Sequence, residues 1–247
     1  MSRIRAVLFD FIGTLVSVKG YHLDVSKMKL YRAIVDAGFK VGEKEFLEAY
    51  TRAHEKYRVV RYQKLVEVTN AVWIAEALNN LGFQTSPEDW RIKTAVNIFF
   101  EDYVNSFRLR KCAKQILSML SESHKLGLVS NFTYAPVIYA GLRKVGINHF
   151  FHVVLVSDAV GWRKPHAEIF NEALRSLGVK AEEVLFVGDS PEEDIKGAKE
   201  LGIKTIFVAS QFFPLRKLLE SGQQPDAVAR SLCEAKMKIQ EMLSWDA

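Results

Sequence analysis

Short runs of apolar residues recur along the chain, and most are followed by a longer stretch with helical periodicity. Five of these runs are hydrophobic throughout, as expected for strands that are buried on both faces of a parallel sheet. The runs are AVLF (6–9), LGLVS (126–130), VVLVS (153–157), VLFVG (184–188) and TIFVA (205–209).

The stretches between the later runs are predicted to be helices that end at glycine. They are APVIYAGLRKVG, ending at Gly146, PHAEIFNEALRSLG, ending at Gly178, and PEEDIKGAKELG, ending at Gly202. Glycine readily adopts the left-handed conformation that follows a last helical turn. Pro165 and Pro191 lie where two first turns are expected. The alternation predicts an α/β fold with a doubly wound, Rossmann-like parallel sheet and helices on both faces.

The long interval between the first two runs is predicted to be helical. In KEFLEAYTRAHEKYRVV, apolar side chains recur at three- and four-residue spacing, and NAVWIAEALNNLG and PEDWRIKTAVNIFFEDYV are also typical of helices. No strand-like alternation occurs between about residues 20 and 105. We therefore predict a helical cap domain (19–105) inserted into a core domain (1–18 and 106–247). The stretches CAKQILSML and LCEAKMKIQEML are predicted to be core helices.

The composition indicates a globular protein. Of the 247 residues, 49% are hydrophobic and 26% are charged. No run approaches the roughly 18 apolar residues that span a bilayer, and the N-terminus lacks the features of a signal peptide. Cys112 and Cys233 are far apart and have no metal-ligand spacing, so neither a disulfide framework nor a zinc site is expected. These features favour a cytoplasmic protein without a membrane partner.

The net charge of +5 is compatible with several kinds of partner. Lysines and arginines alternate with acidic residues, and no basic run with interleaved aromatics or nucleic-acid-binding motif is present. We expect no nucleic-acid partner. A small anionic substrate fits this charge, and the protein is expected to be a monomer or a homodimer.

Polar side chains follow the ends of the predicted strands, which is where open parallel sheets bind ligands. Each of these residues alone would be more typical of a helix cap, a turn or a solvated side chain. Their joint occurrence at strand ends predicts a catalytic site. They are Asp10 after AVLF, Ser130 and Asn131 around the end of LGLVS, Lys164 after VVLVS, Asp189 after VLFVG and Asp194 five residues later.

Together these motifs resemble the haloacid dehalogenase superfamily, which includes many phosphatases. The resemblance covers the first strand and about residues 110–230. Asp10 with Gly13 and Thr14 resembles the first motif, Ser130-Asn131 the second, Lys164 within GWRKP the third, and GDSPEED (188–194) the fourth.

The resemblance implies a Mg²⁺-dependent hydrolase that forms an aspartyl-enzyme intermediate on a small phosphorylated substrate. Asp10 would be the nucleophile, and Lys164 would stabilise charge in the transition state. Mg²⁺ prefers oxygen ligands in octahedral geometry. Its expected ligands are Asp10, Asp189, Asp194 and the backbone carbonyl of Ile12, and the expected phosphate contacts are Thr14, Ser130 and Asn131.

Position 12 departs from the family pattern. Family phosphatases usually have an aspartate there, as the acid for the leaving group and then the base for water, and Ile12 cannot transfer a proton. General acid–base catalysis contributes about 10²–10⁴-fold, or roughly 3–5 kcal/mol of barrier. Alkyl phosphates should therefore be the poorest substrates. Aryl phosphates, acyl phosphates, halides and enolate-like carbon leaving groups should suffer least.

Two active branches of the family also lack this aspartate and supply alternatives. The 2-haloacid dehalogenases act on haloacids without metal, and their fourth motif departs from the Gly-Asp pattern that this chain keeps at Asp189. The phosphonoacetaldehyde hydrolases keep their metal but need a cap lysine as a Schiff base, and no cap lysine stands out here. A catalytically weakened binding protein is the third alternative.

A short basic stretch, HEKYRVVRYQK (54–64), lies in the predicted cap. Arg58 or Arg61 could clamp a substrate carboxylate or phosphate with two parallel hydrogen bonds. A solvated helix face is the alternative for both. Trp162 and His166 flank Lys164 and are expected to be packing and capping residues.

Overall fold

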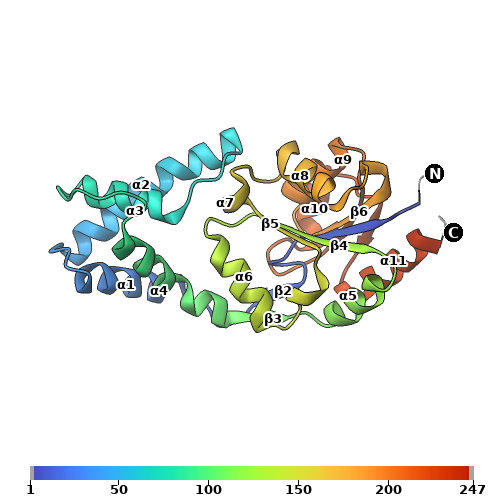
Figure 1. Cartoon of the computed structure of the whole chain (residues 1–247), viewed down its shortest axis with the longest axis horizontal. Coiled ribbons are helices and arrows are strands. Elements are labelled where there is room, and N and C mark those ends of the chain that lie inside the picture. The colour runs from blue at the N-terminus through green and yellow to red at the C-terminus, as the bar shows by residue number, and fades with distance from the viewer. Residues whose placement is uncertain (1–2, 245–247) are drawn as a thin grey trace. The chain divides into compact units, whose positions relative to one another are not determined.

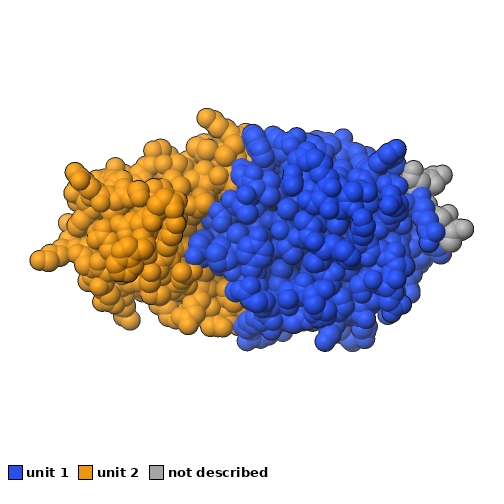
Figure 2. All heavy atoms as spheres, viewed as in Figure 1, with its two compact units in different colours: residues 1–19, 107–247 blue, residues 20–106 orange. Residues whose placement is uncertain are grey.

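The chain divides into two compact units, shown in different colours in Figure 2. The computed structural model describes residues 3–244. Unit 1 comprises residues 1–19 and 107–247, and unit 2 comprises residues 20–106. Each border lies one residue beyond the border expected from the sequence. The role of unit 2 as a cap stays a prediction. Within residues 3–244, no helix is both long enough and apolar enough to cross a bilayer.

Unit 1 is built on a six-stranded parallel sheet with the order β5-β4-β1-β6-β7-β8 (Figure 1). The α/β prediction and all five predicted strands are confirmed. The central position of β1 places the residue that follows it between the ends of β4 and β6. The strands are β1 (Ala6–Phe9), β4 (Lys125–Ser130), β5 (Val153–Val156), β6 (Val184–Gly188), β7 (Lys204–Val208) and the unpredicted β8 (Ala227–Ala229).

Helices cover both faces of this sheet (Figure 1). On one face, buried side chains of α8 (Ala167–Leu177) and α9 (Gly197–Glu200) pack against alternate residues of β1 and β6, including Leu8 and Phe186. Helices α5 (Ala113–Ser121) and α11 (Leu232–Ser244) contact the sheet on the other face. The remaining helical segments are α6 (Ala135–Lys144), α7 (Ser157–Val160), α10 (Leu215–Ser221), η1 (Asn148–Phe150), η2 (Ala181–Glu183) and η3 (Pro191–Lys196).

Of the two helix starts predicted at proline, one is confirmed and one is wrong. Pro191 is the first residue of η3, as expected. Pro165 does not start α8, so that prediction is wrong. His166 caps this helix instead, because its Nδ1 accepts a hydrogen bond from the Glu168 backbone N–H.

Unit 2 consists of four helices, three of which match the stretches named from the sequence, whereas the first was not predicted as a separate helix. They are α1 (Leu23–Asp36), α2 (Glu43–Lys64), α3 (Asn70–Asn79) and α4 (Trp90–Ser106), and the pairs α1–α4 and α2–α3 pack together. Helix α4 starts at Trp90 rather than at Pro87. The Asp89 carboxylate accepts the Arg91 backbone N–H, and this cap sets the start of the helix.

A short antiparallel ribbon, which the sequence did not predict, lies at the border of unit 1. Its strands are β2 (Val16–Val18) and β3 (Phe107–Leu109). Three-residue strands are too short to show an alternating pattern. Strand β2 is followed by Lys19 and then by unit 2, and β3 directly follows unit 2. Both chain connections between the units therefore run through this ribbon.

The two cysteines form a disulfide, which corrects the expectation that no disulfide is indicated. Cys112 precedes α5, Cys233 lies in the first turn of α11, and their Cα atoms are 5.2 Å apart. The cysteines are 121 residues apart, and the sequence contains no sign that the fold brings them together. The bond links two helices on the same face of the sheet.

We expect reduction of this disulfide to lower the free energy of unfolding by about 2–5 kcal/mol, because the crosslink constrains the unfolded chain. Denaturant unfolding with and without a reductant measures this effect. The double variant Cys112→Ser/Cys233→Ser is the control and should unfold identically in both conditions. Free thiols titrated in the untreated wild-type protein would contradict the bond.

Candidate active site

Three carboxylates and one lysine from separate segments meet at the carboxyl edge of the sheet. Asp10 follows β1, Asp189 follows β6, Asp194 lies in η3, and Lys164 lies between α7 and α8. One oxygen of each aspartate lies within 4.8 Å of the other two, and all three residues are buried. The structure therefore brings together the four residues that the sequence assigned to nucleophile, charge stabiliser and metal ligands.

Lys164 is the electrostatic centre of this cluster. Its ammonium lies 2.9 Å from Asp10 Oδ1 and 2.7 Å from Asp194 Oδ1, and it donates to the Val129 carbonyl at 2.7 Å. Burial alone would lower the pKa of Lys164. The two neighbouring carboxylates outweigh burial and raise that pKa above its usual value. The lysine is therefore a permanent cation in a buried site.

The carboxylates carry more charge than Lys164 neutralises. Burial raises the pKa of Asp10 to about 6, with Lys164 opposing the shift and Asp194 adding to it. Burial, followed by the charges of Asp10 and Asp194, also raises the pKa of Asp189. Three carboxylates and one ammonium have a formal charge of −2 when all are ionised. A divalent cation would neutralise this charge.

The donor set fits Mg²⁺. Asp10 Oδ2 is buried and accepts no hydrogen bond from any residue in the range 3–244. Carboxylate oxygens are hard ligands, and Mg²⁺ is a hard cation. The residues that would hold it are Asp10, Asp189 and Asp194, and the Ile12 carbonyl is the further ligand that the family resemblance implies.

Two glycines allow the backbone to approach the carboxylates closely. Gly13 has a φ of +102°, and a Cβ atom there would lie 2.0 Å from Asp189 Oδ2. A Cβ atom on Gly188 would lie 2.4 Å from Asp194 Oδ2. Any other residue at either position would push a carboxylate out of the cluster.

The three predicted phosphate contacts lie at this edge of the sheet in different settings. Asn131 exchanges two hydrogen bonds with the Lys164 backbone: its Nδ2 donates at 2.9 Å and its Oδ1 accepts at 2.8 Å. It therefore holds the Lys164 loop in place. Ser130 is buried at the end of β4, and the Thr14 hydroxyl donates to Asp189 Oδ1 at 3.5 Å. Their contact with substrate phosphate stays a prediction.

Two residues that the sequence analysis did not single out contact this site. The Ser210 hydroxyl donates to Asp189 Oδ2 at 2.5 Å, and the Arg110 guanidinium donates to the backbone carbonyls of Gly13 and Thr14. Ser210 lies two residues beyond β7, so it could have been found as a further polar residue that follows the end of a predicted strand. No sequence signal points to Arg110, which acts on backbone atoms about a hundred residues away.

The predicted cap arginines are both engaged in ion pairs inside unit 2. Arg58 pairs with Glu55 at 2.8 Å on the exposed face of α2. Arg61 is buried and pairs with Glu67 at 2.5 Å. A substrate anion would have to compete with these carboxylates. Their role in substrate binding stays a prediction.

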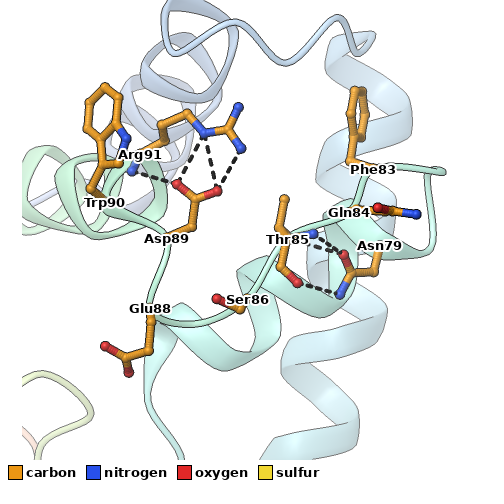
Figure 3. A pocket seen from close by; sticks show the side chains of 9 residues that line it. All are labelled: Asn79, Phe83, Gln84, Thr85, Ser86, Glu88, Asp89, Trp90 and Arg91. Atoms are coloured by element: carbon orange, nitrogen blue, oxygen red, sulfur yellow. Dashed lines mark hydrogen bonds and ion pairs between the residues drawn. The ribbon is translucent and has the colours of Figure 1, made fainter.

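A hollow on unit 2 has no catalytic constellation (Figure 3). The Asn79 amide is hydrogen-bonded to Thr85, and the Asp89 carboxylate pairs with the Arg91 guanidinium at 2.7 Å. The side chains of Asn79, Asp89 and Arg91 are thus engaged within the hollow. We therefore take the carboxylate cluster of unit 1 as the candidate active site.

Comparison with known families agrees with this geometry. A model of the family described as haloacid dehalogenase-like hydrolase matches residues 4–202. The chain belongs to this family. It is therefore a hydrolase, as the motif pattern predicts.

Several relatives of this hydrolase have names that specify phosphatases. The glyceraldehyde 3-phosphate phosphatase of Methanopyrus kandleri is 30% identical over 82% of this chain and 83% of its own length. The protein of that name from Methanocaldococcus jannaschii is 26% identical over 94% of this chain and 95% of its own length.

Solved structures show the same fold. A 2-haloacid dehalogenase from Pseudomonas syringae superposes with a TM-score of 0.64 at 21% identity, covering 99% of this chain and 100% of that one. A haloacid dehalogenase-type hydrolase from Bacillus subtilis, solved bound to magnesium, has a TM-score of 0.61 at 21% identity and covers 98% of this chain and 100% of that one. At this identity the likeness supports the fold alone.

Proposed function

We propose that this hydrolase is a Mg²⁺-dependent phosphatase of small phosphorylated molecules, with Asp10 as the nucleophile. The observation that carries the proposal is the buried cluster of Asp10, Asp189 and Asp194 around Lys164. A haloacid bears one negative charge, whereas three carboxylates with one lysine suit a divalent cation and a phosphate dianion. The relatives named as phosphatases support this choice.

The residues of the chain supply the two halves of the reaction. An Asp10 carboxylate oxygen attacks phosphorus, the bond from phosphorus to the leaving group breaks, and the leaving group departs with the electron pair. Water then attacks phosphorus, the bond to Asp10 breaks with its electron pair on the Asp10 carboxylate, and the two protons of the water leave on the released phosphate. Lys164 stabilises the charge on the phosphoryl oxygens in both steps. When bound, Mg²⁺ supplies the charge neutralisation that lets an anionic nucleophile approach an anionic phosphoryl group.

The proposed substrates are small phosphorylated metabolites. Three kinds of relatives are named for such molecules: glyceraldehyde 3-phosphate, phosphoserine and ribulose 1,5-bisphosphate phosphatases. The identity to the relatives that align over most of this chain is 26–30%, so a substrate class rather than one substrate carries over. The substrates in those names have alkoxide leaving groups, which need a proton. Because Ile12 stands where the family acid usually lies, we carry over the small size and the phosphate group of these substrates but not their leaving group, and we expect this chain to prefer phosphates whose leaving group departs without a proton.

Haloacid hydrolysis is the second candidate, and Ile12 is the observation that favours it. A carbon–halogen bond breaks without protonation of the leaving group, so this reaction does not need the missing acid. The buried pair Asp189 and Asp194 weighs against it, because without a cation these carboxylates would repel a carboxylate substrate.

A panel of acyl, aryl and alkyl phosphates, phosphonoacetaldehyde and 2-chloropropionate, each with Mg²⁺ and with EDTA, tests the proposal. We expect phosphate release that requires Mg²⁺ and is fastest with acetyl phosphate and p-nitrophenyl phosphate. Halide release that persists in EDTA would favour the second candidate. No turnover of any compound would overturn both and favour a binding protein.

Restoring an acid at position 12 should change which phosphates react. We expect Ile12→Asp to raise turnover of alkyl phosphates by about 10²-fold or more and that of aryl phosphates by less, because a restored base for water helps both substrates whereas a restored acid helps only the alkoxide leaving group. Steady-state turnover of a matched alkyl and aryl pair measures this. Ile12→Asn has a similar shape without the acid and is the control. An equal gain with both substrates would count against this explanation.

A further inference from the structure

The segment after β7 contacts a proposed metal ligand directly. The Ser210 hydroxyl donates to Asp189 Oδ2 at 2.5 Å. The Ser210 Oγ atom also accepts hydrogen bonds from the backbone N–H groups of Phe212 and Phe213, each at 3.0 Å. Because two backbone donors occupy its lone pairs, the hydroxyl hydrogen is directed at the carboxylate. Ser210 is therefore fixed as a donor to Asp189.

Arg110 bridges the segment after β7 and the loop that follows Asp10 by hydrogen bonds. Its guanidinium donates to the carbonyls of Gly13 and Thr14 on one side and to the Ala209 carbonyl, at 2.8 Å, on the other. Its own backbone N–H donates to the Leu15 carbonyl at 2.9 Å. A planar guanidinium can bridge two backbone segments in this way, whereas a lysine ammonium has no such fork.

The same segment is also joined to the ribbon. The Gln211 side chain accepts the Val18 backbone N–H at 3.0 Å and donates to the Val18 carbonyl at 3.1 Å. Val18 is the last residue of β2. Residues 209–211 are thus held to the loop at 13–14 by Arg110 and to β2 by Gln211.

We propose that Ser210 and Arg110 are positioning residues for Asp189. Ser210 orients the carboxylate, and Arg110 holds the two backbone segments that enclose it, one carrying Ser210 and the other carrying Gly13 and Thr14. This inference rests on the proposed function, because it concerns Asp189 as a ligand of Mg²⁺. Neither residue touches the reacting atoms.

Positioning of Asp189 should matter because a carboxylate that points away from the metal binds it less tightly. An unrestrained carboxylate samples several rotations, and a metal captures only those that aim an oxygen at it. Hydrogen bonds to ligating groups restrict this rotation, and their loss typically lowers metal affinity or activity about 10–100-fold. Asp189 has one such bond at 2.5 Å from Ser210 and a longer one at 3.5 Å from Thr14, so Ser210 should make the larger contribution.

Calorimetric titration with Mg²⁺ alone tests the role of Ser210 without any substrate. We expect Ser210→Ala to weaken Mg²⁺ binding about 10-fold or more, with Ser210→Thr close to wild type because it keeps the hydroxyl. Ser118→Ala, on the exposed side of α5, is the matched control and should bind Mg²⁺ as wild type does. Wild-type affinity in Ser210→Ala would overturn the role of Ser210.

Amide hydrogen exchange tests the role of Arg110. We expect Arg110→Gln to speed exchange at residues 13–16 and 209–213 about 10-fold while global stability changes little, and to weaken Mg²⁺ binding in the same titration. Arg216→Gln, which removes an exposed arginine of α10, is the control and should change neither. Unchanged exchange and affinity in Arg110→Gln would overturn its role.

The wild-type titration separates this inference from the proposed function. Mg²⁺ binding by wild type together with unchanged binding by both variants overturns the positioning roles and leaves the proposed function standing. A wild-type protein that binds no Mg²⁺ overturns the proposed function and the positioning roles together.

Discussion

Replacing Asp10 with asparagine should lower turnover about 10⁴–10⁶-fold, because the variant keeps the shape of the side chain and loses the nucleophile. The same change should stabilise the metal-free protein at neutral pH. Burial raises the pKa of Asp10 to about 6 from a usual value of 3.8, so the folded state resists ionisation of this carboxyl group. A shift of two pKa units corresponds to up to about 3 kcal/mol.

The sign of this effect sets its pH dependence. A carboxyl group with a raised pKa in the folded state binds its proton more tightly there than in the unfolded chain. Its contribution to stability is therefore fully present below about pH 4 and is lost as the pH rises through about 6. Denaturant unfolding in EDTA across this range measures the loss, and Asp10→Asn should remove this part of the slope. Asp36→Asn, an exposed change at the end of α1, is the control and should leave this slope unchanged.

Turnover of Asp10→Asn within tenfold of wild type would contradict the assignment of Asp10 as the nucleophile.

Replacing Lys164 with methionine should impair both stability and catalysis. The variant leaves Asp10 and Asp194 buried without their cation, and removing one partner of a buried ion pair typically costs about 3–5 kcal/mol. Loss of a charge-stabilising donor should lower turnover about 10²–10³-fold. Denaturant unfolding in EDTA and steady-state assays with Mg²⁺ measure the two effects. Lys114→Met, on the exposed side of α5, should show neither.

A double variant shows whether the loss of stability arises from the pair. Lys164→Met combined with Asp10→Asn removes both charges, so in EDTA Asp10→Asn should stabilise the Lys164→Met variant more than it stabilises the wild type. An equal gain in the two backgrounds would mean that Lys164 stabilises the fold through packing rather than through its charge.

Much of the site could be predicted because each catalytic candidate lies at or after the end of an apolar run. Asp10 and Asp189 directly follow buried strands, and parallel strands bring such residues to one edge of the sheet. The pairing of Asn131 with the Lys164 backbone could not be predicted, because it depends on the conformation of the loop that carries Lys164, 33 residues further along the chain. Strand ends can be recognised from local sequence, whereas loop conformations cannot.

The features missed in the fold have similar causes. Strands β2, β3 and β8 have three residues each, so no alternation can be recognised in them. The disulfide joins positions 121 residues apart, and only the tertiary fold brings α5 and α11 together. Arg110 was missed because its partners are backbone carbonyls, which have no sequence signature.

Ile12 remains the most informative departure from the family pattern. The structure keeps the three carboxylates and Lys164 together next to it, and Gly13 and Thr14 still contact Asp189. The missing group is therefore the proton carrier alone. We therefore propose that the site acts on phosphates whose leaving groups depart without a proton, rather than having lost its activity.

The central claim, that Asp10 accepts a phosphoryl group in the presence of Mg²⁺, has a test that needs no substrate. Beryllium fluoride binds carboxylate nucleophiles as a mimic of a phosphoryl group, and fluorine NMR distinguishes the bound from the free species. We expect a bound signal with Mg²⁺ that disappears in EDTA and in Asp10→Asn. A wild-type protein with no bound signal in Mg²⁺, or an undiminished signal in Asp10→Asn, would contradict the claim.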